Sequence, residues 1–119
     1  MTAPNILAAS NITAKTTGIA GTTVMSNVVV NSVNSSTVAK INSLIVANYS
    51  NSSVGAWVDI YRGGVSYAVI AGNVGVPAYS TMVVVAKDMA VYLEEGDSIR
   101  ANTTANSAAY ITTSYEIIA

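Results

Sequence analysis

The chain has 119 residues, a mass of 12.2 kDa and a net charge of −1, which suits a single domain. Only 9% of its residues are charged and 51% are hydrophobic, whereas roughly 25% are charged in an ordinary soluble domain. It has no His and no Cys, so it lacks the usual general base, the commonest transition-metal ligand and any thiol nucleophile. Its five basic residues are scattered, which argues against nucleic-acid binding, and its longest apolar run is strand-sized, which argues against a membrane helix.

Two interpretations fit a soluble chain with so few charges. One is a weakly charged β domain with no special partner, and the other is a protein that keeps much of its surface against a partner. The polar residues are mostly Ser, Thr and Asn, which form hydrogen bonds without the desolvation cost of an ion. We therefore favour a protein that works within an assembly.

The first 21 residues show no sustained period of 2 or 3.6 and are mainly small and polar. Such a segment cannot bury enough apolar surface to fold alone. We predict an extended N-terminal arm over residues 1–21, held on a neighbouring subunit by main-chain pairing, and a sandwich domain over residues 22–119. The spaced apolar side chains that would anchor this attachment arm are Ile6, Leu7, Ile12 and Ile19.

From residue 22 onward, short runs rich in Val, Ile, Thr and Tyr alternate with Asn, Ser and Gly, a pattern typical of strands and turns. The strands expected in chain order cover residues 22–31, 39–50, 56–62, 65–71, 79–87, 89–93, 98–104 and 108–119. Gly63 and Gly64 predict a hairpin turn, and residues 73–78 read as a loop. About eight strands with turn signals every 8–12 residues predict an all-β fold, a single antiparallel and jelly-roll-like β-sandwich.

Three of the six acidic residues lie within "YLEEGDSIR", at Glu94, Glu95 and Asp97. Adjacent Glu side chains on an extended chain point apart, calcium requires six to eight oxygen ligands, and a glycosidase needs two carboxylates facing one cleft. Gly96 can adopt the positive φ of a tight turn, and Asp97 can accept hydrogen bonds from nearby backbone N–H groups. We therefore predict a structural turn at Gly96 and Asp97 and no catalytic, cofactor or metal site. Asp97 should matter for stability and Glu95 should not.

Trp57, Asp59 and Tyr61 alternate along one expected strand and therefore share a face. Aromatic rings beside a carboxylate make this the best candidate glycan patch in the chain. The alternative, that the aromatic residues pack in the core or at an interface, is favoured.

From about Lys40 to its end, some two-thirds of its length, the chain resembles small β-sandwich virion structural proteins of tailed bacteriophages, notably cyanobacterial and other aquatic phages. The similar pieces are "KINSLIVAN" (40–48), "VDIYR" (58–62), "VYLEEGDSIR" (91–100) and "SYEII" (114–118). The Leu-x-x-Gly-Asp-x-Ile pattern also recurs in unrelated jelly rolls, so the order of the four pieces carries more weight than any one of them.

This resemblance implies a non-enzymatic component of the virion, with no cofactor and with the major capsid protein or other virion proteins as partners. We expect a capsid decoration (cement) protein on the capsid surface, self-associated as a homotrimer, with no nucleic-acid or membrane partner. Two alternatives remain open: a neck, tail or baseplate component, and a receptor- or glycan-binding module of a tail fibre.

Overall fold

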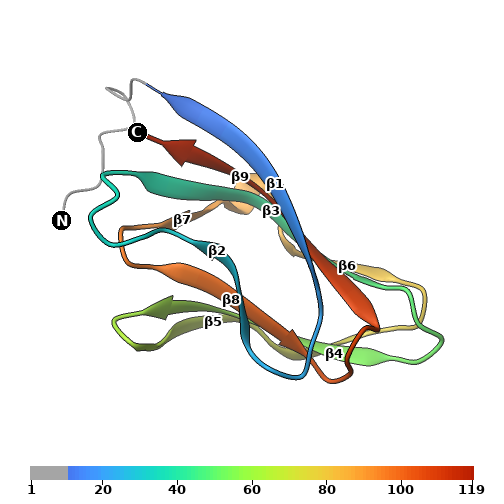
Figure 1. The fold of residues 1–119 in the computed structure, drawn as a ribbon. Coiled ribbons are helices and arrows are strands. Elements are labelled where there is room, and N and C mark those ends of the chain that lie inside the picture. The colour runs from blue at the N-terminus through green and yellow to red at the C-terminus, as the bar shows by residue number, and fades with distance from the viewer. Residues whose placement is uncertain (1–10) are drawn as a thin grey trace.

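The computed structural model describes residues 11–119, which form two packed antiparallel sheets (Figure 1). The first sheet has the strand order β1-β9-β3-β6, with β7 also pairing with β3, and the second has the order β2-β8-β4-β5. The strands are β1 (Ile12–Ala20), β2 (Ser26–Val30), β3 (Val38–Asn48), β4 (Val54–Arg62), β5 (Val65–Val76), β6 (Thr81–Val85), β7 (Val91–Leu93), β8 (Ser98–Thr103) and β9 (Ala109–Ile118).

The connections make this sandwich a jelly roll. Strand β6 pairs with one half of β3 and β7 with the other, and the 3-10 turn Lys87–Met89 separates them, so they share one strand position. Counted that way, each sheet has four strands, and the chain crosses between the sheets as in two Greek keys. The predicted fold class is confirmed.

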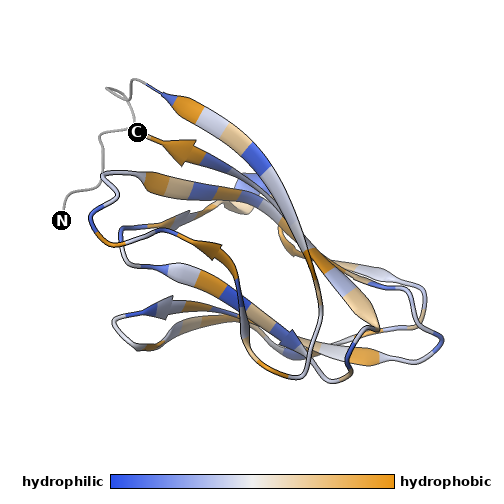
Figure 2. Cartoon of the chain, viewed as in Figure 1, coloured by the Kyte–Doolittle hydropathy of each residue, from blue (hydrophilic) through white to orange (hydrophobic). Residues whose placement is uncertain are grey.

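The core lies between the sheets and is built mainly from alternate residues of strands β2–β9. Ile41, Leu44 and Val46 of β3 are fully buried, as are Val58 of β4 and Ile99 of β8. Apolar and polar residues alternate along several strands because one face of each sheet is buried and the other is exposed (Figure 2). Burying each such side chain stabilises the fold by about 1.5–3 kcal/mol before chain entropy is subtracted.

The eight strands expected from residue 22 onward correspond to β2–β9, and Gly63 and Gly64 form the predicted hairpin turn with φ of +64° and +82°. Strand β5 differs, because it runs to Val76 through residues predicted as a loop. Three register shifts in its pairing with β4 let 12 residues of β5 lie opposite nine of β4. These bulges accommodate the Gly and Asn residues that resemble a loop in the sequence.

The N-terminal segment requires a correction. Residues 12–20, predicted as part of an arm, form β1, the first strand of the jelly roll. This strand pairs with β9 of the same chain without a register shift, from Ile12 opposite Ile118 to Ala20 opposite Tyr110. The predicted boundary at residue 21 is therefore wrong for this segment.

Two of the predicted anchors, Ile12 and Ile19, differ in their burial. Ile19 is partly buried against the core of its own chain, whereas the side chain of Ile12 is 58% exposed. Ile6 and Leu7 lie outside the described residues.

Candidate interaction surfaces

The acidic segment between β7 and β8 is a tight turn, as predicted. The N–H of Asp97 donates to the carbonyl oxygen of Glu94 at 3.0 Å, and Gly96 has a φ of +86°. A positive φ at the third position of a four-residue turn is the conformation of a type II turn, which glycine adopts without strain. Two further backbone bonds fasten the turn to Asn31, which follows β2.

Arg62, the last residue of β4, ties this turn to the second sheet. Its Nε donates to one carboxylate oxygen of Asp97 at 2.8 Å and its Nη2 to the other at 2.7 Å, while Nη2 also donates to Glu94 at 3.0 Å. The backbone N–H of Glu94 donates to Asp97 as well, at 2.9 Å. The hydrogen bonds that Arg62 donates to Asp97, together with the negative charge of that carboxylate, raise the pKa of Arg62 above its ordinary value. This arrangement is a structural joint between three strand ends.

Glu95 is also part of the joint, contrary to the prediction that it is dispensable. Its side chain is buried, and its Oε2 accepts a hydrogen bond from the backbone N–H of Ser36 at 3.0 Å. Ser36 has a positive φ of 57°, an uncommon conformation for a residue other than glycine. The carboxylate of Glu95 therefore holds the loop between β2 and β3.

The predicted glycan patch contains a second internal ion pair. Asp59 lies on β4 opposite Arg100 on β8 and is buried despite being on the outer face of its sheet. Its carboxylate accepts from Arg100 Nε at 2.9 Å, Arg100 Nη2 at 2.8 Å, Trp57 Nε1 at 3.1 Å and Ser66 Oγ at 2.9 Å. Burial alone would raise the pKa of Asp59, but the hydrogen bonds from Arg100, Trp57 and Ser66 and the charge of Arg100 hold that pKa below its ordinary value.

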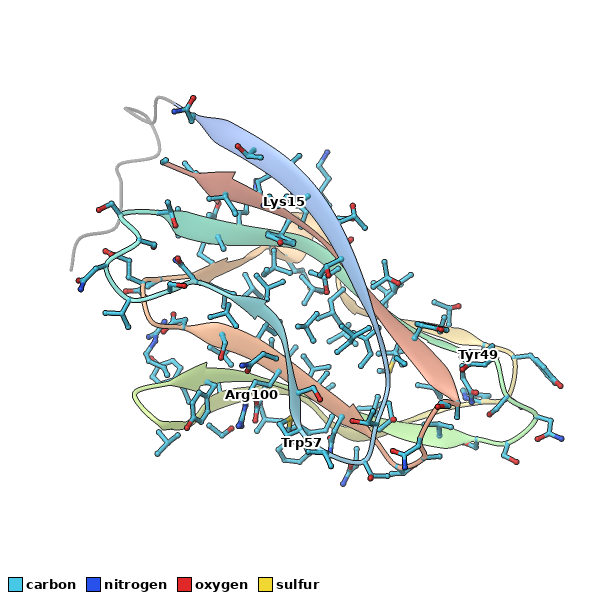
Figure 3. All side chains as sticks on the ribbon, in the orientation of Figure 1. Lys15, Tyr49, Trp57 and Arg100 are labelled. Atoms are coloured by element: carbon cyan, nitrogen blue, oxygen red, sulfur yellow. The ribbon has the colours of Figure 1, made fainter. Side chains whose placement is uncertain are left out.

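The structure does bring Trp57, Asp59 and Tyr61 together, and the guanidinium of Arg100 lies 4.2 Å from the centre of the Tyr61 ring. Figure 3 shows Trp57 and Arg100 near each other on the second sheet. However, four hydrogen bonds already occupy the Asp59 carboxylate, so its oxygens are not free to orient a sugar hydroxyl. The hydrogen bonds of this cluster link strands β4, β5 and β8. Sequence reasoning missed Arg100, 41 residues away in the chain, because only the β4–β8 register places it beside Asp59.

A tyrosine pair forms the most prominent aromatic surface. Tyr49 and Tyr110 stack with ring centroids 5.3 Å apart, and each remains about half exposed. The hydroxyl of Tyr49 donates to the carbonyl oxygen of Ser107 at 2.6 Å, which fixes its ring (Figure 3). Tyr79, whose side chain is 74% exposed, joins this end of the molecule through a backbone bond to Ser50.

Within residues 11–119 there is no pocket and no group of three potential metal-ligating side chains. The same residues include no helix of the length and hydropathy needed to cross a bilayer. What the described part of the chain offers to a partner is therefore its outer surface, not an enclosed site.

No protein-family model and no curated protein matches the chain. A solved structure from the Bacillus endospore appendages, described as a novel family of disulfide-linked pili, is similar in fold, with a TM-score of 0.51 and 12% sequence identity. The match covers 90% of this chain and 86% of that one. At this identity the likeness shows a shared fold.

Proposed function

We propose that this chain is a non-enzymatic structural subunit of a bacteriophage particle, acting as a capsid decoration (cement) protein. The observation that carries a structural role is the outer surface. Seven of the 11 charged residues neutralise one another in four ion pairs within the chain. At the same time, 14 large hydrophobic residues within residues 11–119 are exposed.

Such a surface favours contact with other proteins. Tyr is enriched at protein interfaces because it buries a large apolar area and keeps a polar tip. Tyr49, Tyr79, Tyr92 and Tyr110 are all exposed. Covering this surface would release water from apolar groups and strip few ions of their hydration. A cement protein of this kind adds buried area across the boundaries between capsid subunits and needs no chemistry.

The assignment to a phage particle is supported by the resemblance of four strand segments to virion proteins of tailed phages. Neck, tail and baseplate locations belong to the same proposal, since each would use the same surface. A glycan-binding role at Trp57, Asp59 and Tyr61 is less favoured, because Asp59 is buried and its carboxylate already accepts four hydrogen bonds within the chain.

A second candidate is a subunit of a surface appendage, favoured by the fold similarity to the endospore pilus structure. That protein belongs to a family described as disulfide-linked, whereas this chain has no Cys. An appendage built from it would therefore not be linked by disulfides between copies of this chain.

Binding to phage particles that lack the protein tests the proposal. We expect the purified chain to bind saturably and to raise the temperature at which the shells release DNA. Val83 of the first sheet and Val69 of the second are both exposed, so V83K and V69K are matched variants that place a charge on either sheet. We expect one of them to weaken binding by at least tenfold while the other binds as the wild type does. The proposal fails if the wild-type chain does not bind particles.

A further inference from the structure

Strand β1 contributes little to the core of the sandwich. The buried core draws residues from each of the strands β2–β9 and none from β1. Only Ile19 of β1 packs against the core, and it is partly buried. Removing β1 from its place would therefore leave the core residues of the other eight strands in contact.

Main-chain pairing with β9 is what holds β1 in place. The two strands are in register at nine consecutive positions, and the pairing continues to Asn11 and Ala119, whose N–H groups each donate to the other's carbonyl oxygen. One side-chain contact adds to this, between the hydroxyls of Thr16 and Ser114 at 3.3 Å. Strand β9 would make the same bonds to an identical strand from another copy of the chain.

The chain immediately after β1 is clamped to the sandwich. Gly21 donates its N–H to the carbonyl oxygen of Ala109 at 2.7 Å and accepts from the N–H of Ser107 at 3.1 Å. A Cβ at Gly21 would lie 2.7 Å from the side chain of Thr103, so only glycine fits there without a shift. The backbone N–H of Thr103 also donates to the carbonyl oxygen of Thr22 at 2.8 Å. The junction of residues 20 and 21 is therefore a fixed point about which β1 can turn without disturbing the core.

We propose that β1 exchanges between copies of this chain, so that in the assembled protein it pairs with β9 of a neighbouring subunit. The occupant is a second copy because only the same sequence reproduces the continuous register, the Thr16–Ser114 contact and the packing of Ile19 opposite Ile111. Exchange of an identical element costs little, since β1 makes the same interactions with β9 of its own chain and with β9 of a neighbour.

Geometry sets where the neighbouring subunit has to lie. All of β1 is used in pairing, from Ile12 opposite Ile118 to Ala20 opposite Tyr110, and Gly21 stays bonded to Ala109 of its own chain. The β9 strand of the neighbour must therefore begin beside this junction. Reciprocal exchange would give a closed dimer, and head-to-tail exchange would give a ring such as the expected trimer. This inference rests on the proposed function, because the exchange of β1 and assembly on a particle both require copies of the chain to come into contact.

Because the chain has no Cys, engineered cysteines report the exchange directly. The single variants T16C and S114C are purified separately, mixed at about millimolar concentration and oxidised. A disulfide between residues 16 and 114 can then form only between chains. The control mixture is I45C with T112C, which lie opposite each other on the central strands β3 and β9 and cannot exchange without unfolding the core. Non-reducing electrophoresis and mass spectrometry of the linked peptides give the yields.

We expect the yield of the 16–114 heterodimer to be at least tenfold higher than the yield of the 45–112 heterodimer. Equal yields from the two mixtures overturn the inference. The double variant T16C/S114C, bound to particles and then oxidised, separates this failure from that of the proposed function. Binding with disulfides only within single chains would leave the function standing and refute exchange, whereas heterodimers in solution without particle binding would refute the function and support exchange.

Discussion

Replacing Asp97 by Ala removes the acceptor on which the joint between β4, β7 and β8 depends. The side chain of Asp97 is 1% exposed and accepts two hydrogen bonds from Arg62 and one from the N–H of Glu94. Hydrogen bonds to charged groups contribute about 1.5–3 kcal/mol each. Arg62 is about one-third exposed and keeps its contact with Glu94, so solvent and that carboxylate recover part of the loss. We expect D97A to lower the free energy of unfolding by about 2–4 kcal/mol.

Glu94 provides the matched control, because its carboxylate contacts the same guanidinium but is 55% exposed. An exposed ion pair contributes about 0–1 kcal/mol, so E94A should lower the free energy of unfolding by no more than about 1 kcal/mol. Urea denaturation followed by circular dichroism measures both variants against the wild type, with the slope of each transition checked for a change in the unfolded state. Equal losses in D97A and E94A, or a loss below about 1 kcal/mol in D97A, would refute the assignment of Asp97 as the buried centre of the joint.

The remaining predictions concern Asp59, two glycines and self-association. The pKa of Asp59 is held below its ordinary value, so its stabilising contribution is complete above about pH 4 and is lost as the pH falls through the lower folded-state pKa. Replacing Asp59 by Asn should therefore lower stability at pH 7 and flatten its decline in acid, and an unchanged acid profile in urea titrations would contradict this. G21A should destabilise the fold by about 1–3 kcal/mol because the added Cβ would clash with Thr103. G75A should be neutral, because a Cβ at that position meets nothing within 4 Å. Equal effects of the two substitutions in thermal melts would argue against the clash. Sedimentation equilibrium should show a trimer, and a monomer at high concentration would contradict that expectation.

The sequence pattern predicts strands β2–β9, which contribute residues to the core. It does not predict β1, which contributes none. Strands such as β3 and β4 largely alternate buried apolar residues with partly buried ones, and this alternation is the signal by which a strand is recognised in a sequence. Strand β1 contributes no buried residue, so its side chains are free to be Thr, Ala and Lys and show no period. The position of β1 is set by its pairing with the edge of β9, and no local pattern in the sequence of β1 indicates that pairing.

The turn at Gly96 and Asp97 is predictable because glycine and aspartate have local reasons to be there. Their partner Arg62 is not predictable, since it reaches the turn only through the placement of β4 beside β8. The same holds for the burial of Glu95, which follows from the position of the loop carrying Ser36.

The four segments on which the proposed likeness to phage virion proteins rests are joined in pairs in the fold. Arg62 and Asp59 of "VDIYR" pair with Asp97 and Arg100 of "VYLEEGDSIR", and Lys40 of "KINSLIVAN" lies 4.0 Å from Glu116 of "SYEII". These motifs therefore fasten the sandwich internally. The exposed residues Tyr110 and Val83 lie outside these motifs, whereas the exposed Tyr92 lies within "VYLEEGDSIR".

Quantitative mass spectrometry of purified virions tests the central claim most directly, by counting copies of this chain relative to the major capsid protein. A cement protein that binds across the shell should be present at hundreds of copies per particle. A dozen or fewer copies would place the chain in the neck, tail or baseplate instead. Its absence from intact particles would contradict the proposal of a virion structural subunit.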